Sequence, residues 1–352
     1  MRAPHAEPAA VPVARRDPTA FAGRVELPVL ESEVLRGNPL GDPHVREVPV
    51  YVPPGHGGDE RLPVVFLLSG FTGRGHSLLE SHPWKGGFVR QWDQRVRRGE
   101  APRALLVMPD CLTRLGGSQY VNSSATGRYE DHVADELVPF IDASFATSGA
   151  RAVAGKSSGG FGALHLAMRR PGLFAAAASL SGDCCFEYPF AQELLVAARG
   201  LAPLGGDPRR FLARFEESYD LSGDNHAVLN VLAMSACYSP NPASPYGFDL
   251  PLDVETGARR PDVWARWLGF DPVHAAAAHA EALRALALLY LEAGAKDEFH
   301  LQLGLRVLTR ELTRLGVPHE HVEHDGGHFG LDARYHVAVP RLVEALARGS
   351  AR

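Results

Sequence analysis

A short apolar strand that turns through Gly-x-Ser-x-Gly into a helix constrains this chain more than any other stretch of its sequence. Residues 152–154 are small and apolar, Ser157 stands between Gly155 and Gly159, and a helical segment then runs to Pro171. Both glycines lie where a Cβ would collide as the backbone reverses, so the serine can be held in a strained conformation with its hydroxyl projecting. Many matches to this pattern are ordinary loops, but the flanking strand and helix favour a nucleophile on a strand–turn–helix unit.

Apolar strands alternate with helical stretches along most of the chain, which predicts an α/β fold. Continuous apolar runs lie at residues 62–68 and 104–108, and a third run at 286–292 is apolar up to its last residue, Glu292. Runs of this kind are typical of a mostly parallel central sheet that is flanked by helices. Two segments have other patterns: residues 45–52 alternate like one antiparallel strand, and residues 340–347 predict a terminal helix with proline at its first position.

The alternation breaks from residue 184 to residue 285, a stretch longer than ordinary connections in compact domains. We interpret 184–285 as a cap-like insertion that divides the core into 25–183 and 286–352 and precedes the strand bearing the predicted acid. Residues 1–24, rich in alanine, proline and arginine, predict a loose tail. Aromatic residues of the insertion could line a substrate pocket or form the insertion's own core, and both interpretations stay open for Phe186, Tyr188, Phe190, Tyr238, Tyr246, Phe248, Trp264 and Trp267.

Three polar residues that follow predicted strands have the types and the order of a catalytic triad. A serine hydroxyl needs a histidine to accept its proton, and that histidine needs a carboxylate to fix its tautomer. Ser157, Asp297 and His328 occur in the order nucleophile, acid, base, each at the carboxyl end of a strand. Asp297 could instead cap the helix that follows it. The rival acids are Asp183, Glu292 and Glu298.

Two backbone N–H groups are predicted to form an oxyanion hole. One belongs to Phe71, in the loop of residues 69–73 that follows the strand at 62–68. The other belongs to Ser158, directly after the nucleophile at the start of a helix, where free amides and the helix dipole favour negative charge. Lys156 beside the nucleophile is assigned no catalytic role, since a solvated or ion-paired lysine is the usual case.

Four histidines near the C-terminus also suggest a metal site: His319, His321, His324 and His328. In a strand, His319 and His321 share one face while His324 falls on the other, so these side chains are not expected to converge. No pair of cysteines has the spacing of zinc ligands. We therefore predict no metal and no organic cofactor.

Composition disfavours several classes of partner. The net charge of −5 and the pI near 6.3 provide no basic field for nucleic acid or an anionic membrane. The chain has no apolar run of about 20 residues. Pro12 interrupts the short apolar stretch near the N-terminus, so we predict no signal-peptide core. Four cysteines are too few for a disulfide scaffold and fit a reducing, cytoplasmic location. Homo-oligomerisation is left open.

Several motifs together resemble those of the esterase D superfamily of α/β-hydrolases, which includes feruloyl esterases, S-formylglutathione hydrolases, enterochelin esterase-like enzymes and mycolyltransferases. The motifs are Phe-Leu-Leu-Ser-Gly-Phe at 66–71, Ser-Gln-Tyr-Val-Asn-Ser at 118–123, Tyr-Glu-Asp at 129–131, the turn around Ser157, Gly-Ala-Lys-Asp-Glu at 294–298 and Gly-Gly-His at 326–328. The resemblance implies an α/β-hydrolase fold with the triad and oxyanion amides named above. It also implies that Tyr120 and Asn122 border the substrate. Lys156, Ser158 and the long insertion depart from the commoner pattern and leave the substrate undefined.

Together these features predict a serine carboxylic-ester hydrolase that acts on a small-molecule ester through an acyl-serine intermediate. A thioesterase or an acyltransferase of the same fold stays open, because these enzymes differ only in the group released or in what enters second. A ligand-binding homologue that has lost turnover is the alternative from another class.

Overall fold

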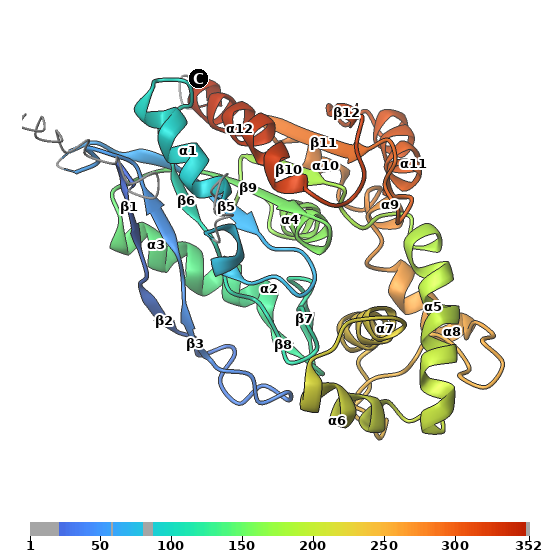
Figure 1. Cartoon of the computed structure of the whole chain (residues 1–352). Helices are drawn as coiled ribbons and strands as arrows, with labels where there is room; N and C mark the ends of the chain where they lie inside the picture. Colours follow the sequence, from blue (N-terminus) through green and yellow to red (C-terminus); the bar gives the residue numbers. More distant parts are fainter. Residues whose placement is uncertain (1–20, 58, 80–86, 350–352) are drawn as a thin grey trace, which may run out of the picture.

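The structure is a computed structural model that describes residues 21–57, 59–79 and 87–349 (Figure 1). Its strands are β1 (Arg24–Glu26), β2 (Val29–Glu31), β3 (Val45–Glu47), β4 (Val50–Val52), β5 (Leu62–Leu68), β6 (Leu105–Val107), β7 (Asn122–Ser123), β8 (Gly127–Arg128), β9 (Thr147–Lys156), β10 (Ala176–Leu180), β11 (Leu288–Gly294) and β12 (Glu320–His324). Its α-helices are α1 (Phe88–Arg97), α2 (Tyr129–Asp131), α3 (Val138–Ser144), α4 (Ser158–Arg169), α5 (Glu187–Leu201), α6 (Pro208–Ser218), α7 (Asn225–Tyr238), α8 (Pro261–Leu268), α9 (Pro272–Ala275), α10 (Ala280–Arg284), α11 (Leu301–Arg314) and α12 (Tyr335–Gly349). Short 3-10 helices are η1 (Gly75–Leu78), η3 (Ala202–Leu204) and η4 (Leu331–Arg334), and η2 (His132–Leu137) is a π-helical segment.

The central sheet has eight strands in the order β1-β4-β6-β5-β9-β10-β11-β12. All neighbours from β6 to β12 in this order pair in parallel, whereas β4 and β1 add antiparallel pairs at one edge. Two small sheets, β2-β3 and β7-β8, lie apart from it. The prediction of an α/β fold with a mostly parallel central sheet is confirmed.

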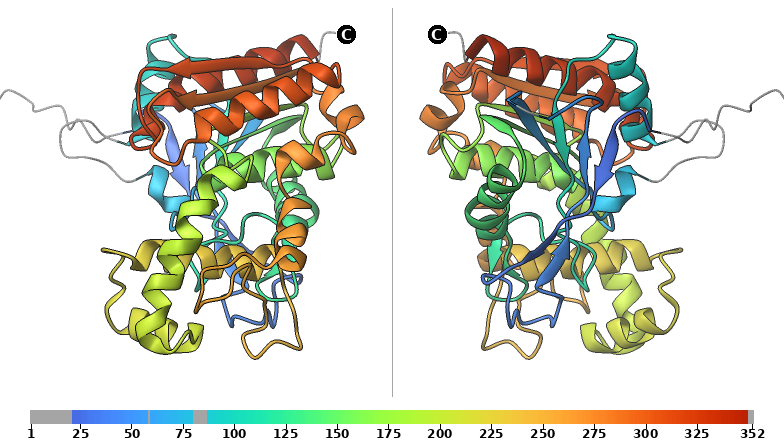
Figure 2. Two further views of the ribbon diagram at one scale, coloured as in Figure 1. Left: turned by 90° about the vertical axis from the view of Figure 1, so that its right-hand side faces the viewer. Right: turned by 90° about the vertical axis from the view of Figure 1, so that its left-hand side faces the viewer.

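Helices cover both faces of this sheet (Figure 1 and Figure 2). On β5, Val64, Phe66 and Leu68 belong to the core that contains side chains of α3, α4 and α11, while Val65 and Leu67 belong to the core that contains α1 and α12. All five side chains are fully buried. A strand that is covered on both faces must be apolar at every position, which explains the continuous apolar run at residues 62–68.

Helices α5 to α8 of the predicted insertion are grouped apart from the central sheet (Figure 1). They share a separate core, which contains six of the aromatic residues singled out above: Phe186, Phe190, Tyr238, Phe248, Trp264 and Trp267. Tyr246 packs against this core and Tyr188 is exposed. Beyond α8 the chain rejoins the core of the sheet through Ala276, Ala280 and Leu283. Most of the aromatic residues therefore stabilise the insertion itself.

Residues 45–52 form two short strands instead of the single strand that we predicted. β3 pairs with β2, whereas β4 lies between β1 and β6 in the central sheet. Pro49 separates the two strands and has no N–H to donate, but its carbonyl accepts the N–H of Met108 at 2.9 Å. The alternating pattern continues through the proline although the hydrogen-bonding partner changes.

The prediction that the terminal helix begins at Pro340 is wrong, because α12 begins at Tyr335 and contains this proline. A proline inside a helix leaves the carbonyl four residues earlier without its usual donor. Here that carbonyl belongs to His336, and it accepts a hydrogen bond from Nη1 of Arg95 in α1 at 3.2 Å. A distant residue thus replaces the bond that the proline removes.

Of the predicted loose tail, residues 1–24, the first twenty lie outside the described residues. The N–H groups of Ala22 and Gly23 donate to the carboxylate of Asp93 at 2.7 and 2.8 Å, and Arg24 begins β1. The folded core therefore starts before residue 25, because the carboxylate of a helix far along the chain fixes these amides.

Candidate active site

Ser157 lies in the sharp turn between β9 and α4, with φ of 54° and ψ of −127°. A positive φ is strained for a residue with a side chain and is typical of functional turns. A Cβ on Gly155 would lie 2.1 Å from the carbonyl oxygen of Gly159, and a Cβ on Gly159 would lie 2.1 Å from that of Leu68. Glycine is therefore required at both positions, for the reason that the sequence pattern indicates.

Three side chains form a hydrogen-bonded chain in which His328 lies between Ser157 and Asp297. Nε2 of His328 is 3.0 Å from Oγ of Ser157, and Nδ1 of His328 is 2.9 Å from Oδ2 of Asp297. The three residues follow β9, β12 and β11, which lie in one parallel part of the sheet. Their carboxyl ends share an edge, so residues 171 positions apart in the sequence meet there.

Asp297 is held by two sets of contacts. Its Oδ2 faces His328, while its Oδ1 accepts the N–H groups of Phe299 at 3.0 Å and Leu301 at 3.5 Å. Burial by itself would raise the pKa of this carboxyl, but the hydrogen bond and charge of His328 outweigh burial and lower the pKa. The carboxylate therefore stays ionised. One of its oxygens accepts backbone N–H groups at the start of α11 while the other contacts the imidazole.

Two of the rival acids are bound to other groups. Glu298 accepts the backbone N–H of His328 at 2.6 Å, so it contacts the loop and not the ring. Glu292 forms an ion pair with Arg334 and accepts the hydroxyl hydrogen of Tyr290. Both carboxylates support the surroundings of the imidazole without contacting its nitrogens in any hydrogen bond among the described residues.

Asp183, the third rival, lies beside the reaction centre. Its Oδ2 accepts the hydroxyl of Ser158 at 3.5 Å, and its side chain is 8% exposed. Burial raises the pKa of Asp183 to about 6, an effect that the charge of His328 reduces and that of Asp297 increases. In the described part of the chain, Asp297 remains the acid that is hydrogen-bonded to the imidazole.

Phe71 and Ser158, whose amides are predicted to form the oxyanion hole, line the same cavity as Ser157. Neither backbone N–H donates to another described residue. The loop of Phe71 packs closely on the nucleophile, because a Cβ on Gly70 would be 3.3 Å from Cβ of Ser157. Both donors are thus free beside the hydroxyl, and their role as an oxyanion hole stays a prediction.

Tyr120 and Asn122, predicted to border the substrate, do not line this cavity. The hydroxyl of Tyr120 donates to the carbonyl of Ser69 at 2.8 Å, and its ring is so close to Gly162 that a Cβ there would be 2.3 Å from Cδ2. The amide of Asn122 exchanges hydrogen bonds with Asp131. Tyr120 therefore supports the loop of Phe71 from within the core, and a substrate contact by Tyr120 or Asn122 stays a prediction.

A cavity of about 430 Å³ opens onto Ser157. Its lining combines loops of the sheet with helices of the insertion, and consists of Gly70, Phe71, Thr72, Lys156, Ser157, Ser158, Asp183, Pro189, Phe190, Glu193, His226, Asn230, Phe299, His328, Phe329, Gly330 and Leu331. Among the eight aromatic residues of the insertion named above, Phe190 alone lines it. Lys156 forms an ion pair with Asp332, so of the two predicted alternatives, a solvated or an ion-paired lysine, the second is found.

Glu193, His226 and Asn230 line the cavity but were not singled out by the sequence. Glu193 had a detectable signal, because it lies three residues after Phe190 and four before Ala197, on the buried stripe of α5. A glutamate on an apolar helix face needs a polar partner or a function. His226 and Asn230 on α7 carry no comparable signal, since their helix is apolar on several sides.

The histidines predicted not to converge on a metal make separate contacts. Nδ1 of His319 is 2.9 Å from the carbonyl of Val317, His321 lies near Glu323 and His324 near Glu292.

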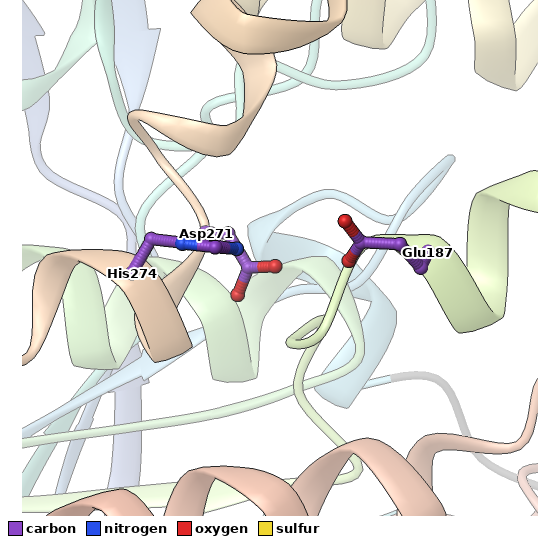
Figure 3. Close-up of side chains that lie close together, drawn as sticks. All are labelled: Glu187, Asp271 and His274. Carbon is purple, nitrogen blue, oxygen red and sulfur yellow. The ribbon is translucent and has the colours of Figure 1, made fainter.

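Another group, Glu187, Asp271 and His274, brings its side chains together between α5 and α9 (Figure 3). The oxygens of Asp271 accept three backbone N–H groups, from Cys185, Phe186 and Val273. These bonds identify Asp271 as a structural cap that joins the two ends of the insertion.

The model of the family described as "Putative esterase" matches residues 43–329, which is most of the chain and includes the three hydrogen-bonded side chains. The chain belongs to this esterase family. Over 141 residues it is 31% identical to an endo-1,4-beta-xylanase/feruloyl esterase of Xylanibacter ruminicola, which corresponds to 38% of this chain and 19% of that protein. The chain thus spans about a fifth of the length of that relative.

This chain has the same fold as several solved esterase structures over nearly its whole length. A ferulic acid esterase is similar with a TM-score of 0.58 and 20% identity, over 93% of this chain and 100% of the other. An S-formylglutathione hydrolase from Agrobacterium tumefaciens is similar with a TM-score of 0.56 and 17% identity, over 93% and 97% of the two chains. These similarities confirm the α/β-hydrolase fold.

In the described part of the esterase, no helix combines the length and the apolar character needed to cross a bilayer.

Proposed function

We propose that this esterase hydrolyses carboxylic esters through an acyl-serine intermediate, with Ser157 as nucleophile, His328 as base and Asp297 as acid. The observation that carries the proposal is the pair of contacts at the imidazole, 3.0 Å from Nε2 to Ser157 Oγ and 2.9 Å from Nδ1 to Asp297 Oδ2. This arrangement lets the imidazole accept a proton on one nitrogen while the carboxylate binds the N–H of the other. A ligand-binding protein would have no need of the strained serine.

In the first half of the reaction, Oγ of Ser157 attacks the ester carbonyl and its proton passes to Nε2 of His328. Negative charge then develops on the carbonyl oxygen, where the N–H groups of Phe71 and Ser158 are free to donate. The imidazolium next gives its proton to the departing alkoxide, so that an alcohol leaves and an acyl-serine remains. Asp297 stabilises the imidazolium throughout, and its own pKa is lowered by that contact.

In the second half, water takes the place of the alcohol. His328 accepts a proton from this water, the hydroxide adds to the acyl carbonyl, and collapse of the intermediate returns the proton to Oγ of Ser157. The products are a carboxylic acid and the free enzyme. A cavity of about 430 Å³ sets the scale of the substrate, which supports a small-molecule ester as the partner of this site.

We also propose a cytoplasmic location. All four cysteines are free thiols, and three of them, Cys111, Cys184 and Cys237, are buried. Thiols of this kind are typical of a reducing compartment.

The proposal is tested with p-nitrophenyl esters of increasing acyl length on the wild type and on Ser157→Ala. Removal of the nucleophile should reduce kcat by about 10⁶-fold, as in other enzymes with this triad. Ser148→Ala is the matched control, because Ser148 is an exposed serine of the same strand β9. Turnover that survives in Ser157→Ala would contradict the mechanism.

Thioesters and an added alcohol extend the same assay. Release of the thiol from a thioester at a rate above that of the matched ester would identify a thioesterase. Transfer of the acyl group to the alcohol in preference to water would identify an acyltransferase. Preferential release of free acid from oxygen esters is the result that we expect.

A further inference from the structure

Two buried carboxyl groups line the active-site cavity and have no role in the reaction proposed above. Asp183 follows β10 and is 8% exposed, and Glu193 lies on α5 and is 9% exposed. They come from different parts of the fold, one from the core and one from the insertion, and both border the space that an ester must enter. Their position makes them part of the substrate's surroundings.

Neither acid forms an ion pair with a lysine or arginine among the described residues, and His328, whose charge lowers the pKa of Asp183, is already paired with Asp297. Glu193 accepts a hydrogen bond from the amide of Asn230 at 2.5 Å, and Asp183 accepts a long one from Ser158 and another from the side chain of Gln119. Lys156 is the cavity-lining residue with a permanent positive charge, and Asp332 already pairs with it. The cavity therefore has two acids and no free cation within the described part of the chain.

The titration of both acids agrees with this imbalance. Burial, opposed by the hydrogen bond from Asn230 and reinforced by the nearby charge of Asp183, raises the pKa of Glu193 to about 8. Burial also raises the pKa of Asp183 to about 6. His226, the other titratable group of the insertion at this cavity, has its pKa lowered by burial and adds no positive charge at neutral pH. A bound cation would relieve the cost of both carboxylates.

Aromatic rings supply the rest of the lining. Phe71, Phe190, Phe299 and Phe329 all border the cavity. The face of an aromatic ring attracts a cation, and rings combined with carboxylates are a common way for proteins to bind organic ammonium groups. An anionic group would meet two acids here, and a purely apolar group would leave both without a partner.

We propose that Asp183 and Glu193 make this cavity selective for esters that carry a positively charged amine in their acyl or alcohol part. The inference rests on the proposed function, because it defines the substrate of the same site. Asp183 and Glu193 act as substrate-binding residues through their charge, while the aromatic rings contact the carbon atoms around the nitrogen.

The test compares esters that differ only in charge. For the acyl side, the pair is p-nitrophenyl 4-(trimethylammonio)butanoate and its neutral isostere p-nitrophenyl 5,5-dimethylhexanoate. For the alcohol side, the pair is choline butyrate and 3,3-dimethylbutyl butyrate, followed by release of acid. We expect kcat/KM to favour the cationic member of at least one pair by about tenfold or more.

Variants assign this preference to the acids. At pH 9, above the pKa of about 8, Glu193→Gln keeps an acceptor for Asn230 and removes a negative charge, so the ratio of cationic to neutral kcat/KM should fall by about tenfold. Glu187→Gln is the matched control on the same helix, because Glu187 does not line the cavity, and it should keep the wild-type ratio. In Ser157→Ala, choline should bind more tightly than 3,3-dimethylbutanol by calorimetry, which measures selectivity without turnover.

Each outcome separates this inference from the proposed function. If the wild type hydrolyses the neutral esters but prefers no cationic member, the inference is overturned and the serine mechanism stands. If neither member of either pair is hydrolysed, the proposed function fails. Equal binding of choline and 3,3-dimethylbutanol by Ser157→Ala overturns the inference when the acyl pair also shows no preference for its cationic member. A ratio that Glu193→Gln leaves unchanged also contradicts it.

Discussion

Replacement of Asp297 by asparagine should reverse the hydrogen bonding of the catalytic imidazole. Oδ1 of Asp297 accepts the N–H of Phe299 at 3.0 Å, so the carbonyl oxygen of an asparagine is held in that position. The NH₂ group must then take the place of Oδ2, 2.9 Å from Nδ1 of His328. Because an NH₂ group donates, Nδ1 has to accept, and the proton of the neutral ring moves to Nε2. Nε2 faces Ser157 and can no longer accept its proton.

The expected loss follows from this tautomer. The same substitution in serine proteases lowers kcat by about 10⁴-fold, which corresponds to about 5.5 kcal/mol. We expect a loss of about this size here, since Asp297 is buried and Phe299 holds its orientation. The assay is kcat/KM for p-nitrophenyl acetate at pH 8, with circular dichroism to verify that the variant is folded.

The matched controls are the other acids around the imidazole. Glu298→Gln keeps an acceptor for the N–H of His328, and Asp183→Asn makes the same isosteric change in the other buried aspartate. Each should lose less than about tenfold on this neutral ester. Activity of Asp297→Asn within tenfold of wild type, or an equal loss in Asp183→Asn, would refute the assignment of the acid.

Three further substitutions test the supporting structure. Tyr120→Phe removes the bond to the carbonyl of Ser69, so it should cost about 1–3 kcal/mol in denaturant unfolding and reduce kcat/KM by a similar factor for short and long acyl esters; a loss confined to one acyl length would instead indicate substrate contact. Gly162→Ala puts a Cβ 2.3 Å from the ring of Tyr120 and should destabilise by about 1–3 kcal/mol, so an unchanged unfolding midpoint would contradict the packing. In the wild type the native pKa of Glu193, about 8, lies above the ordinary glutamate value of 4.5, so the folded state loses stability as pH rises between these values. The stability of Glu193→Gln relative to wild type should therefore increase as the pH rises from 5 to 9. A difference in Tm between the two proteins that stays constant over this range would contradict this prediction.

Features that depend on neighbouring residues could be predicted from the sequence. The turn at Ser157 needs glycine on both sides because the backbone passes within contact distance of itself, and this requirement appears as a local motif. The run at residues 62–68 is apolar at every position because both faces of β5 are covered. Asp297 and His328 were predictable because each follows a strand, and parallel strands bring their carboxyl ends to one edge.

Features that depend on distant partners could not be predicted in this way. Pro340 is tolerated inside α12 because Arg95 satisfies the carbonyl of His336, a contact across 241 positions. Tyr120 supports the loop of Phe71 because its hydroxyl reaches Ser69, 51 positions away. No local pattern contains either pairing. The sequence therefore favoured a helix start at Pro340, and the contact of Tyr120 with Ser69 could not be foreseen.

Covalent labelling tests the central claim most directly. The protein is incubated with a fluorophosphonate, its intact mass is measured, and the modified peptide is mapped by mass spectrometry. The account predicts a single adduct on Ser157, its absence from Ser157→Ala, and slower labelling of His328→Ala because Nε2 no longer accepts the proton of the serine. An unlabelled Ser157 in folded, ester-hydrolysing protein would contradict it.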